Sequence, residues 1–375
     1  MKLMHLSDLH LGRRLHERSL LEDQRHILQQ LLDIAAAERP DGVLIAGDVY
    51  DKAVPSAEAV ELFDDFLVQL AERTPHIFLI SGNHDSPERI AFGGRLMDSR
   101  GVHVSPVYTG TVEPVTVEDE YGPVDFWLLP FLKPIHVRRL FPDREIGSYT
   151  DAMAVAMEQM SLNPGRRNVL VTHQFVTGAS ASGSEELSVG GMDNVDAGVF
   201  DAFDYVALGH LHGPQPVSRP GIRYCGSPLK YSFAETKQEK SVTLVTLDAD
   251  GLGGIRFLPL TPLRDLRQIR GSFEELTVSS AFHSGAREDY IQAILTDEDD
   301  IPDAIGRLRS VYPNILSLDY DNARTRSAGF LPGETAPEKA PLELFEEFYT
   351  FINNHAMTDE QRSFLRGLLE EEGLL

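Results

Sequence analysis

Five short apolar runs in this chain each end on residues that can bind a metal ion, and this pattern constrains the fold more than any other feature. The runs with their endings are residues 4–10, 43–48, 77–85, 169–173 and 206–212. Short apolar runs rich in β-branched residues predict buried strands. Because ligands that follow such strands lie at the strand ends, we expect them to meet along one edge of a sheet.

The polar residues at these endings form a set suited to two metal ions. The seven candidate ligands are Asp8, His10, Asp48, Asn83, His173, His210 and His212. Seven ligands are too many for one four-coordinate ion, but they suit two ions that share a carboxylate. Asp48 is the candidate for the shared carboxylate, since Gly47 lets the backbone approach the ions closely. Two cations about 3.5–4 Å apart can bind the attacking and departing oxygens of a displacement at phosphorus, so the sequence predicts phosphate-ester hydrolysis.

The spacing within the motifs leads to further expectations. If the chain is extended at Asp8-x-His10 and His210-x-His212, the two side chains of each pair point the same way. His84 lies beside Asn83 without being needed as a ligand, so we expect it to stabilise the developing charge or to protonate the departing oxygen. Two roles remain open for the neighbouring Asp85, which can orient His84 or support the loop.

The ligand types narrow the choice of ion. Imidazole, carboxylate and amide ligands without a thiolate favour Mn²⁺, Fe²⁺ or Zn²⁺ over Mg²⁺ or Ca²⁺. Cys225 is the single cysteine of the sequence, which excludes an intrachain disulfide and a thiolate-rich metal site and fits a reducing compartment.

Composition limits the location and the partners of the chain. No apolar run approaches the roughly 18 residues that a membrane span needs, and the first ligand-bearing run begins at the N-terminus without a signal peptide. We therefore expect a cytoplasmic protein that does not enter a membrane. The net charge of −24 disfavours a broad nucleic-acid surface, so a polyanionic substrate is expected to be held locally, by metals or by a partner.

The order of apolar patterns predicts four segments. Helical spacing over residues 19–38 and about 55–73, alternating with strands, predicts a parallel βαβαβ arrangement. Shorter strands follow, so residues 1–261 are expected to form a mixed α/β sandwich flanked by helices. A small α/β capping domain is expected over residues 262–320, with strands at 290–295 and 315–318 and a helix at 301–311.

The remaining residues are expected to form a linker and two helices. Residues 321–341 lack an apolar period and contain three prolines, which predicts a flexible linker. Residues 342–375 predict two amphipathic helices, the second opened by a capping box of Thr358 and Gln361. So short a segment cannot bury its apolar surface alone, so the helices must dock either on their own chain or on a partner protein.

Taken together, Asp8-x-His10, Gly47-Asp48, the motif at 82–85, His173 and Gly209-His210-x-His212 resemble the five signature blocks of the calcineurin-like metallophosphoesterases. This resemblance covers about residues 1–215. The motif at residues 7–13, the small cap and the tethered helices more closely resemble the nuclease subunits of bacterial SbcCD complexes. The resemblance implies a metallophosphoesterase β-sandwich with an α/β cap and C-terminal partner-binding helices.

The resemblance also implies an activity and a division of the ligands. One Mn²⁺ would be bound by Asp8, His10, Asp48 and His212, the other by Asp48, Asn83, His173 and His210, and His84 would act on the transition state. Mg²⁺, Fe²⁺ and Zn²⁺ are the alternative ions.

The implied function is a 3′→5′ exonuclease on double-strand ends and an endonuclease on hairpins. The chain would act in DNA repair and recombination as a homodimer, with its C-terminal helices bound to the ATPase SbcC. A small-molecule phosphatase or cyclic-nucleotide phosphodiesterase on the same core is the alternative. Where some relatives have a histidine three residues after the shared aspartate, this chain has Asp51.

Overall fold

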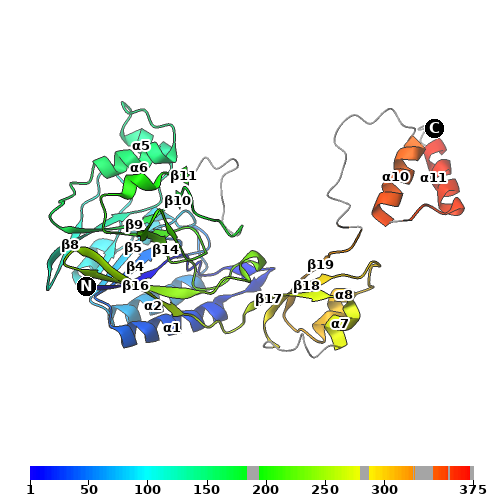
Figure 1. The fold of residues 1–375 in the computed structure, drawn as a ribbon, viewed down its shortest axis with the longest axis horizontal. Helices are drawn as coiled ribbons and strands as arrows, with labels where there is room; N and C mark the ends of the chain where they lie inside the picture. The colour runs from blue at the N-terminus through cyan, green and yellow to red at the C-terminus, as the bar shows by residue number, and fades with distance from the viewer. Residues whose placement is uncertain (184–193, 279–286, 324, 326–340, 354, 372–375) are drawn as a thin grey trace. The chain divides into compact units, whose positions relative to one another are not determined.

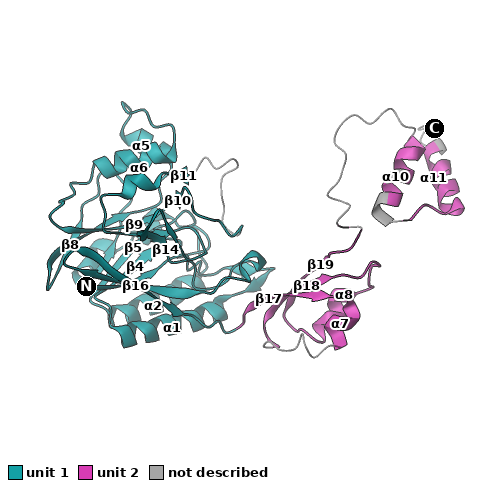
Figure 2. Cartoon of the chain, viewed as in Figure 1, with its two compact units in different colours: residues 1–263 teal, residues 264–375 magenta. Residues whose placement is uncertain are grey.

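The computed structural model describes residues 1–183, 194–278, 287–323, 325, 341–353 and 355–371 (Figure 1). They divide into two compact units, residues 1–263 and 264–375 (Figure 2). Each unit has its own core, and the N-terminal unit contains all eight of the candidate site residues.

The first sheet of the N-terminal unit has six strands in the order β16-β15-β1-β4-β5-β6. Strands β1, β4, β5 and β6 run parallel, and β15 and β16 are antiparallel to their neighbours. The bounds are β1 Lys2–Leu6, β4 Gly42–Ala46, β5 His76–Ile80, β6 Val102–Val104, β15 Ser241–Asp248 and β16 Gly251–Pro259. The central strands are apolar at nearly every position because both faces of the sheet are covered.

The second sheet also has six strands, in the order β13-β14-β12-β9-β8-β7. Strands β14, β12, β9 and β8 run parallel, and an antiparallel strand lies at each edge. The bounds are β7 Val115–Asp119, β8 Gly122–Leu129, β9 Arg167–His173, β12 Tyr205–Gly209, β13 Gln215–Val217 and β14 Arg219–Tyr224.

The two sheets pack face to face through one apolar cluster. Phe78 of β5 stacks on Phe126 of β8 with ring centroids 4.0 Å apart and an interplanar angle of 14°. Leu44 and Ala46 of the first sheet belong to the same cluster as Val171 of the second. Full burial of such a side chain is worth about 1.5–3 kcal/mol, so this contact holds the sheets together and aligns their ends.

Helices cover the outer faces of the two sheets. Helices α1, Leu21–Glu38, and α2, Ala57–Ala71, lie on one side of the unit, and α5, Pro134–Leu140, and α6, Tyr149–Glu158, lie on the opposite side (Figure 1). The apolar residues of α6 pack into one cluster with the outward residues of β9 and β12. The helices expected at residues 19–38 and 55–73 are confirmed, as is the mixed α/β sandwich.

Short elements complete the N-terminal unit. They are β2 Arg14–Leu15, β3 Arg18–Ser19, α3 Pro87–Ile90, α4 Gly94–Met97, η1 Asp98–Arg100, β10 Phe175–Val176, β11 Asn194–Val195, η2 Ala197–Phe200 and η3 Phe233–Glu235.

The second unit contains a small α/β fold. Strands β17, Leu266–Gly271, β18, Tyr290–Leu295, and β19, Ile315–Tyr320, form a parallel sheet that packs against α7, Phe273–Val278, and α8, Ala304–Arg309. The strands expected at 290–295 and 315–318 are confirmed. The helix expected at 301–311 begins later, because Asp303 adopts a left-handed φ of 48° directly before it.

Two further helices end this unit. They are α10, Pro341–Asn353, and α11, Asp359–Glu371. The capping box is confirmed, since Gln361 N donates to Thr358 Oγ1 at 3.2 Å and Thr358 N donates to Gln361 Oε1 at 2.9 Å. Most of the expected linker, residues 326–340, lies outside the described residues, and the division at 261, 320 and 341 stays a prediction. None of the described helices combines the length and the apolar character needed to cross a membrane.

Candidate metal centre

The candidate ligands converge at the carboxyl ends of five strands from both sheets. The loops after β1, β4 and β5 carry Asp8, His10, Asp48, Asn83 and His84, and the ends of β9 and β12 carry His173, His210 and His212. All eight residues expected from the sequence are brought together. The expectation that they meet along one sheet edge is wrong, because the ligands come from two sheets that pack face to face.

A first group of ligand atoms forms around His10. The Nε2 atoms of His10 and His212 lie 3.1 Å apart, and Asp8 offers a carboxylate oxygen within 4.8 Å of both residues' ligand atoms. Asp48 Oδ2 lies 3.7 Å from His10 Nε2. These four side chains therefore surround one volume.

A second group forms around Asn83. Its Oδ1 atom lies 2.9 Å from His173 Nε2 and 2.9 Å from His210 Nδ1. Asp48 Oδ2 lies 3.4 Å from His173 Nε2. Asp48 thus contacts a histidine of each group, which is the position that a shared carboxylate requires.

The spacing of these atoms fits divalent cations. Two ligand atoms that each lie about 2.1 Å from one ion, at right angles, are about 3.0 Å apart. The separations of 2.9 and 3.1 Å within the two groups match this value. The donor set of imidazole, carboxylate and amide atoms, almost all buried, therefore fits a pair of ions.

Four of the candidate ligands have left-handed backbones, which is uncommon for residues other than glycine. The φ angles are 53° at Asp8, 44° at His10, 48° at Asp48 and 107° at His210. The expectation that Asp8 and His10 alternate along an extended strand is wrong, because β1 ends at Leu6. Strain of this kind costs on the order of 1–3 kcal/mol per residue and persists only where the surroundings impose it.

Hydrogen bonds between the loops impose these conformations. The backbone N–H of Asp8 donates to Gly47 O at 3.1 Å, and that of His10 donates to Asp48 O at 2.9 Å. The backbone N–H of His210, from the other sheet, donates to the Asp8 carboxylate at 3.1 Å. The strained turns are thus held by bonds that also join the two sheets.

Two of the motif glycines are needed because the loops approach one another closely. A Cβ atom on Gly82 would lie 2.1 Å from Asp48 Oδ1, and one on Gly209 would lie 1.8 Å from Ala46 O. Any larger residue at either position would push apart the two loops or the two sheets. The glycines of the sequence motifs therefore serve tertiary contact.

Asp85 supports the loops of the site. Its carboxylate accepts hydrogen bonds from the backbone N–H groups of Val49 at 3.1 Å, Tyr50 at 2.9 Å and Gly82 at 2.9 Å. His84 Nδ1 lies instead 3.1 Å from the backbone oxygen of Asp51. Of the two roles expected for Asp85, the contacts favour loop support.

Burial and charge act in opposite directions on the pKa values of the cluster. Burial raises the pKa of Asp8 to about 6, although His173 and His212 oppose the shift. Burial alone would also raise the pKa of Asp48, but His173, His10 and His84 outweigh it and hold this pKa well below its ordinary value.

His173 shows the reverse balance. Burial lowers its pKa, but the carboxylates of Asp48 and Asp8 outweigh burial and raise it to about 9. A protonated His173 therefore compensates buried negative charge. Cations that enter the cluster would take over this compensation and displace the proton.

Sequence reasoning missed two buried charged residues beside the cluster. Glu235 Oε1 lies 2.9 Å from His212 Nδ1, and Lys240 Nζ donates to Glu235 Oε2 at 2.6 Å. Glu235 follows His212 by 23 residues, and no motif marks it.

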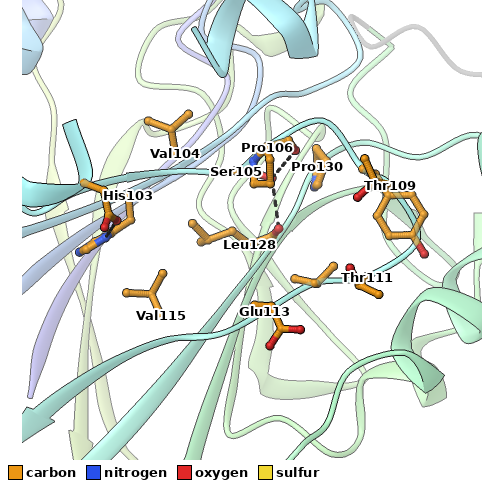
Figure 3. Close-up of a pocket in the computed structure, with 13 residues that line it drawn as sticks. His103, Val104, Ser105, Pro106, Thr109, Thr111, Glu113, Val115, Leu128 and Pro130 are labelled. Carbon is orange, nitrogen blue, oxygen red and sulfur yellow. Dashed lines mark hydrogen bonds and ion pairs between the residues drawn. The ribbon is translucent and has the colours of Figure 1, made fainter. Parts of the chain in front are cut away.

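A separate pocket lies beside β6 in the N-terminal unit (Figure 3). It has a volume of about 250 Å³, and its lining includes His103, Glu113 and Leu128. Ser105, also in the lining, donates to Leu128 O at 3.2 Å. None of the eight candidate site residues lines this pocket, so the convergent cluster is the candidate site.

Comparison with known proteins gives this cluster a family context. The family model described as calcineurin-like phosphoesterase matches residues 1–214, more than half of the chain. The chain belongs to the calcineurin-like phosphoesterase family. Members of this family use a site with two metal ions, which agrees with the two ligand groups around Asp48.

The rest of the chain narrows the family further. The family model described as type 5 capsule protein repressor C-terminal domain matches residues 262–352. The chain is 36% identical over 376 residues to SbcD, the nuclease subunit of SbcCD, from Staphylococcus epidermidis, covering 98% of each sequence. It is therefore a member of the SbcD family among these phosphoesterases.

Two solved structures are similar over part of the chain. GAP50, the anchor in the inner membrane complex of Plasmodium, has a TM-score of 0.41 at 10% identity, covering 70% of this chain and 89% of that one. A dimetal phosphatase from Danio rerio has a TM-score of 0.40 at 12% identity, covering 70% of this chain and 99% of that one.

Proposed function

We propose that this chain is a DNA nuclease that hydrolyses phosphodiester bonds with two Mn²⁺ ions. It would degrade double-strand ends in the 3′→5′ direction and cleave hairpins, in DNA repair and recombination. The observation that carries the proposal is the position of Asp48, which contacts a histidine of each ligand group at 3.7 and 3.4 Å. The 36% identity to an SbcD nuclease along nearly the whole chain supports DNA as the substrate.

We assign the ligands as the two groups suggest. Asp8, His10 and His212 would bind one ion, Asn83, His173 and His210 the other, and Asp48 both. When bound, such ions lower the pKa of a water molecule to about 7 and bind the phosphate oxygens, with Mg²⁺, Fe²⁺ or Zn²⁺ as alternatives to Mn²⁺.

His84 is proposed to act on the reacting phosphate. Its backbone N–H donates to Asp48 Oδ1 at 2.9 Å, which ties its loop to the shared carboxylate. Its Nδ1 can donate to the backbone oxygen of Asp51 at 3.1 Å, which leaves Nε2 available. In the protonated ring Nε2 can stabilise the developing charge or give a proton to the departing sugar oxygen.

The acidic balance of the chain indicates that DNA binding depends on a partner. With a net charge of −24, a long duplex would be repelled unless the ions and another protein supply positive charge. We propose that this partner is an SbcC-type ATPase, that the chain acts as a homodimer, and that the complex is cytoplasmic.

Helices α10 and α11 are the proposed docking surface for the ATPase. Among their described side chains, Phe348 is 59% and Phe364 is 70% exposed, and Leu344, Phe345 and Leu368 are also exposed. Apolar groups gathered at this density on a short helical pair are typical of protein interfaces.

The test is cleavage by the purified chain. Linear duplex and hairpin DNA are incubated with the protein and Mn²⁺, beside a phosphomonoester and a cyclic nucleotide. We expect cleavage of both DNAs, loss of cleavage with a chelator, and slow turnover of the small substrates. Rapid hydrolysis of the small substrates without DNA cleavage would overturn the proposal in favour of a small-molecule phosphoesterase.

A further inference from the structure

Glu235 is a buried carboxylate that bridges a candidate metal ligand and a buried lysine. Its side chain is 0% exposed. One oxygen lies 2.9 Å from His212 Nδ1, and the other accepts a hydrogen bond from Lys240 Nζ at 2.6 Å. Because a buried carboxylate without partners is very costly, both of these contacts are needed to keep it in the core.

Lys240 fixes the position of the carboxylate and of the His212 main chain. Its Nζ atom lies 2.8 Å from Ser227 Oγ, 2.7 Å from Gln238 Oε1 and 2.9 Å from the backbone oxygen of His212. The ammonium therefore neutralises Glu235 and holds His212 from a second direction.

This geometry defines which nitrogen of His212 carries a proton. An ionised carboxylate only accepts hydrogen bonds, so the contact with Glu235 places the hydrogen on Nδ1 of the neutral ring. The lone pair is then on Nε2, the atom that faces His10 Nε2 at 3.1 Å. A metal ion within the Asp8–His10–His212 group requires this tautomer.

The second ligand group is supported differently. His173 Nδ1 lies 2.9 Å from the backbone oxygen of Ala46, a neutral acceptor. A carboxylate backed by a lysine polarises an imidazole more strongly than a carbonyl does. A change at Glu235 should therefore affect one ligand group much more than the other.

We propose that Glu235, held by Lys240, is a positioning residue that fixes the ring and tautomer of His212 and so sets the cation affinity of the Asp8–His10–His212 group. The inference rests on the proposed function, in that it takes these residues to bind ions. It adds a residue pair beyond the ligands and His84, and it predicts that the two ions are bound with separately adjustable affinities.

The test counts bound ions in the full-length protein. Equilibrium dialysis against Mn²⁺ with metal analysis should give two ions per wild-type chain. Glu235→Gln keeps an acceptor but loses the charge, and should weaken one ion by about 10-fold while the other keeps its affinity. Glu235→Leu combined with Lys240→Met removes acceptor and charges together at similar volume, and should weaken the same ion by about 100-fold. The double variant also serves if Glu235→Gln alone fails to fold.

Glu38→Gln is the matched control. Glu38 also pairs with two cations, Lys2 at 3.4 Å and Arg256 at 2.6 Å, and none of its contacts reaches the cluster. This variant should bind two ions with wild-type affinity.

A second readout follows the tautomer directly. In ¹⁵N-histidine spectra of the metal-free protein, His212 should be an Nδ1–H tautomer in the wild type and should lose that preference in the double variant. If the wild type binds two ions and the Glu235 variants bind both unchanged, or weaken both equally, the inference is overturned while the proposed function stands. A wild type that binds no ion would overturn the proposed function and, with it, this inference.

Discussion

At the scale of single residues, the site separates groups that bind ions from groups that act beside them. Asp48 contacts both histidine groups, whereas His84 is joined to the cluster mainly through its backbone and the Asp51 oxygen. One Nε2 or Nδ1 atom of His84 also lies within 4.8 Å of ligand atoms of His10 and Asp48, so its role has to be tested against that of a ligand.

His84→Ala should keep both Mn²⁺ ions and lose most phosphodiester cleavage. Loss of a group that moves a proton in the transition state costs about 10²–10⁴-fold in rate. The measurement combines single-turnover cleavage of linear duplex DNA with counting of bound metal. Cleavage at the wild-type rate would reject the role of His84, and loss of one ion would make it a ligand.

Gly82→Ala should disrupt the centre because of a steric clash. The new Cβ would lie 2.1 Å from Asp48 Oδ1, so the loop must move away from the shared carboxylate. We expect a loss of about 1–3 kcal/mol in the free energy of unfolding and loss of tight Mn²⁺ binding. The control is Gly254→Ala on β16, where nothing lies within 4 Å of the added Cβ. Equal metal binding by both variants would contradict this explanation of the motif.

At the scale of elements, the edge hairpin of the second sheet is joined to the strand that carries His173. Asp119 at the end of β7 accepts two hydrogen bonds from Arg167 at the start of β9, at 2.6 and 2.9 Å. The Arg167 side chain is buried, so this bidentate pair is stronger than a surface ion pair.

Asp119→Asn should destabilise the protein in a pH-dependent way. The bond to Arg167 holds the pKa of Asp119 well below its ordinary value of 3.8. A lowered pKa adds stability that is present above the unfolded value and is lost as the pH falls below it. We expect the wild type to exceed the variant by about 2 kcal/mol at pH 7, with a smaller difference at pH 3.

Urea unfolding of both proteins at the two pH values measures this difference. Comparing the two proteins cancels the contributions of the other carboxylates. A gap that widens at low pH would contradict the argument.

At the scale of the whole molecule, the catalytic and docking parts are expected to be separable. The core of the small α/β fold is formed by residues between Ile269 and Tyr320, and the metal cluster lies within residues 1–263. Neither set includes residues of α10 or α11.

Deletion of residues 326–375 should therefore leave Mn²⁺-dependent nuclease activity and remove binding to an SbcC-type ATPase. The check is co-purification of the ATPase with full-length and shortened chains, with cleavage of linear duplex measured on both. A shortened chain that still co-purified with the ATPase would refute docking through the helices. A shortened chain that unfolded would favour docking on its own chain.

Local sequence was sufficient for the elements and for the identity of the site residues. Apolar runs determined β4 and β5, and helical spacing predicted α1 to within two residues of Leu21–Glu38. The eight site residues could be selected because each directly follows a strand, and strand ends depend on neighbouring residues.

Other features depended on which strands lie beside each other, and this information is not local. The ligands come from two sheets, Asp8 and His10 have left-handed backbones, and Gly209 approaches Ala46 from the opposite sheet. Glu235 could not be found from the sequence, because its contact with His212 joins residues 23 positions apart with no shared motif. Chain chemistry thus specified the ligands, while the packing of the two sheets specified their geometry and supporting charges, since distant segments acquire their neighbours only in the folded state.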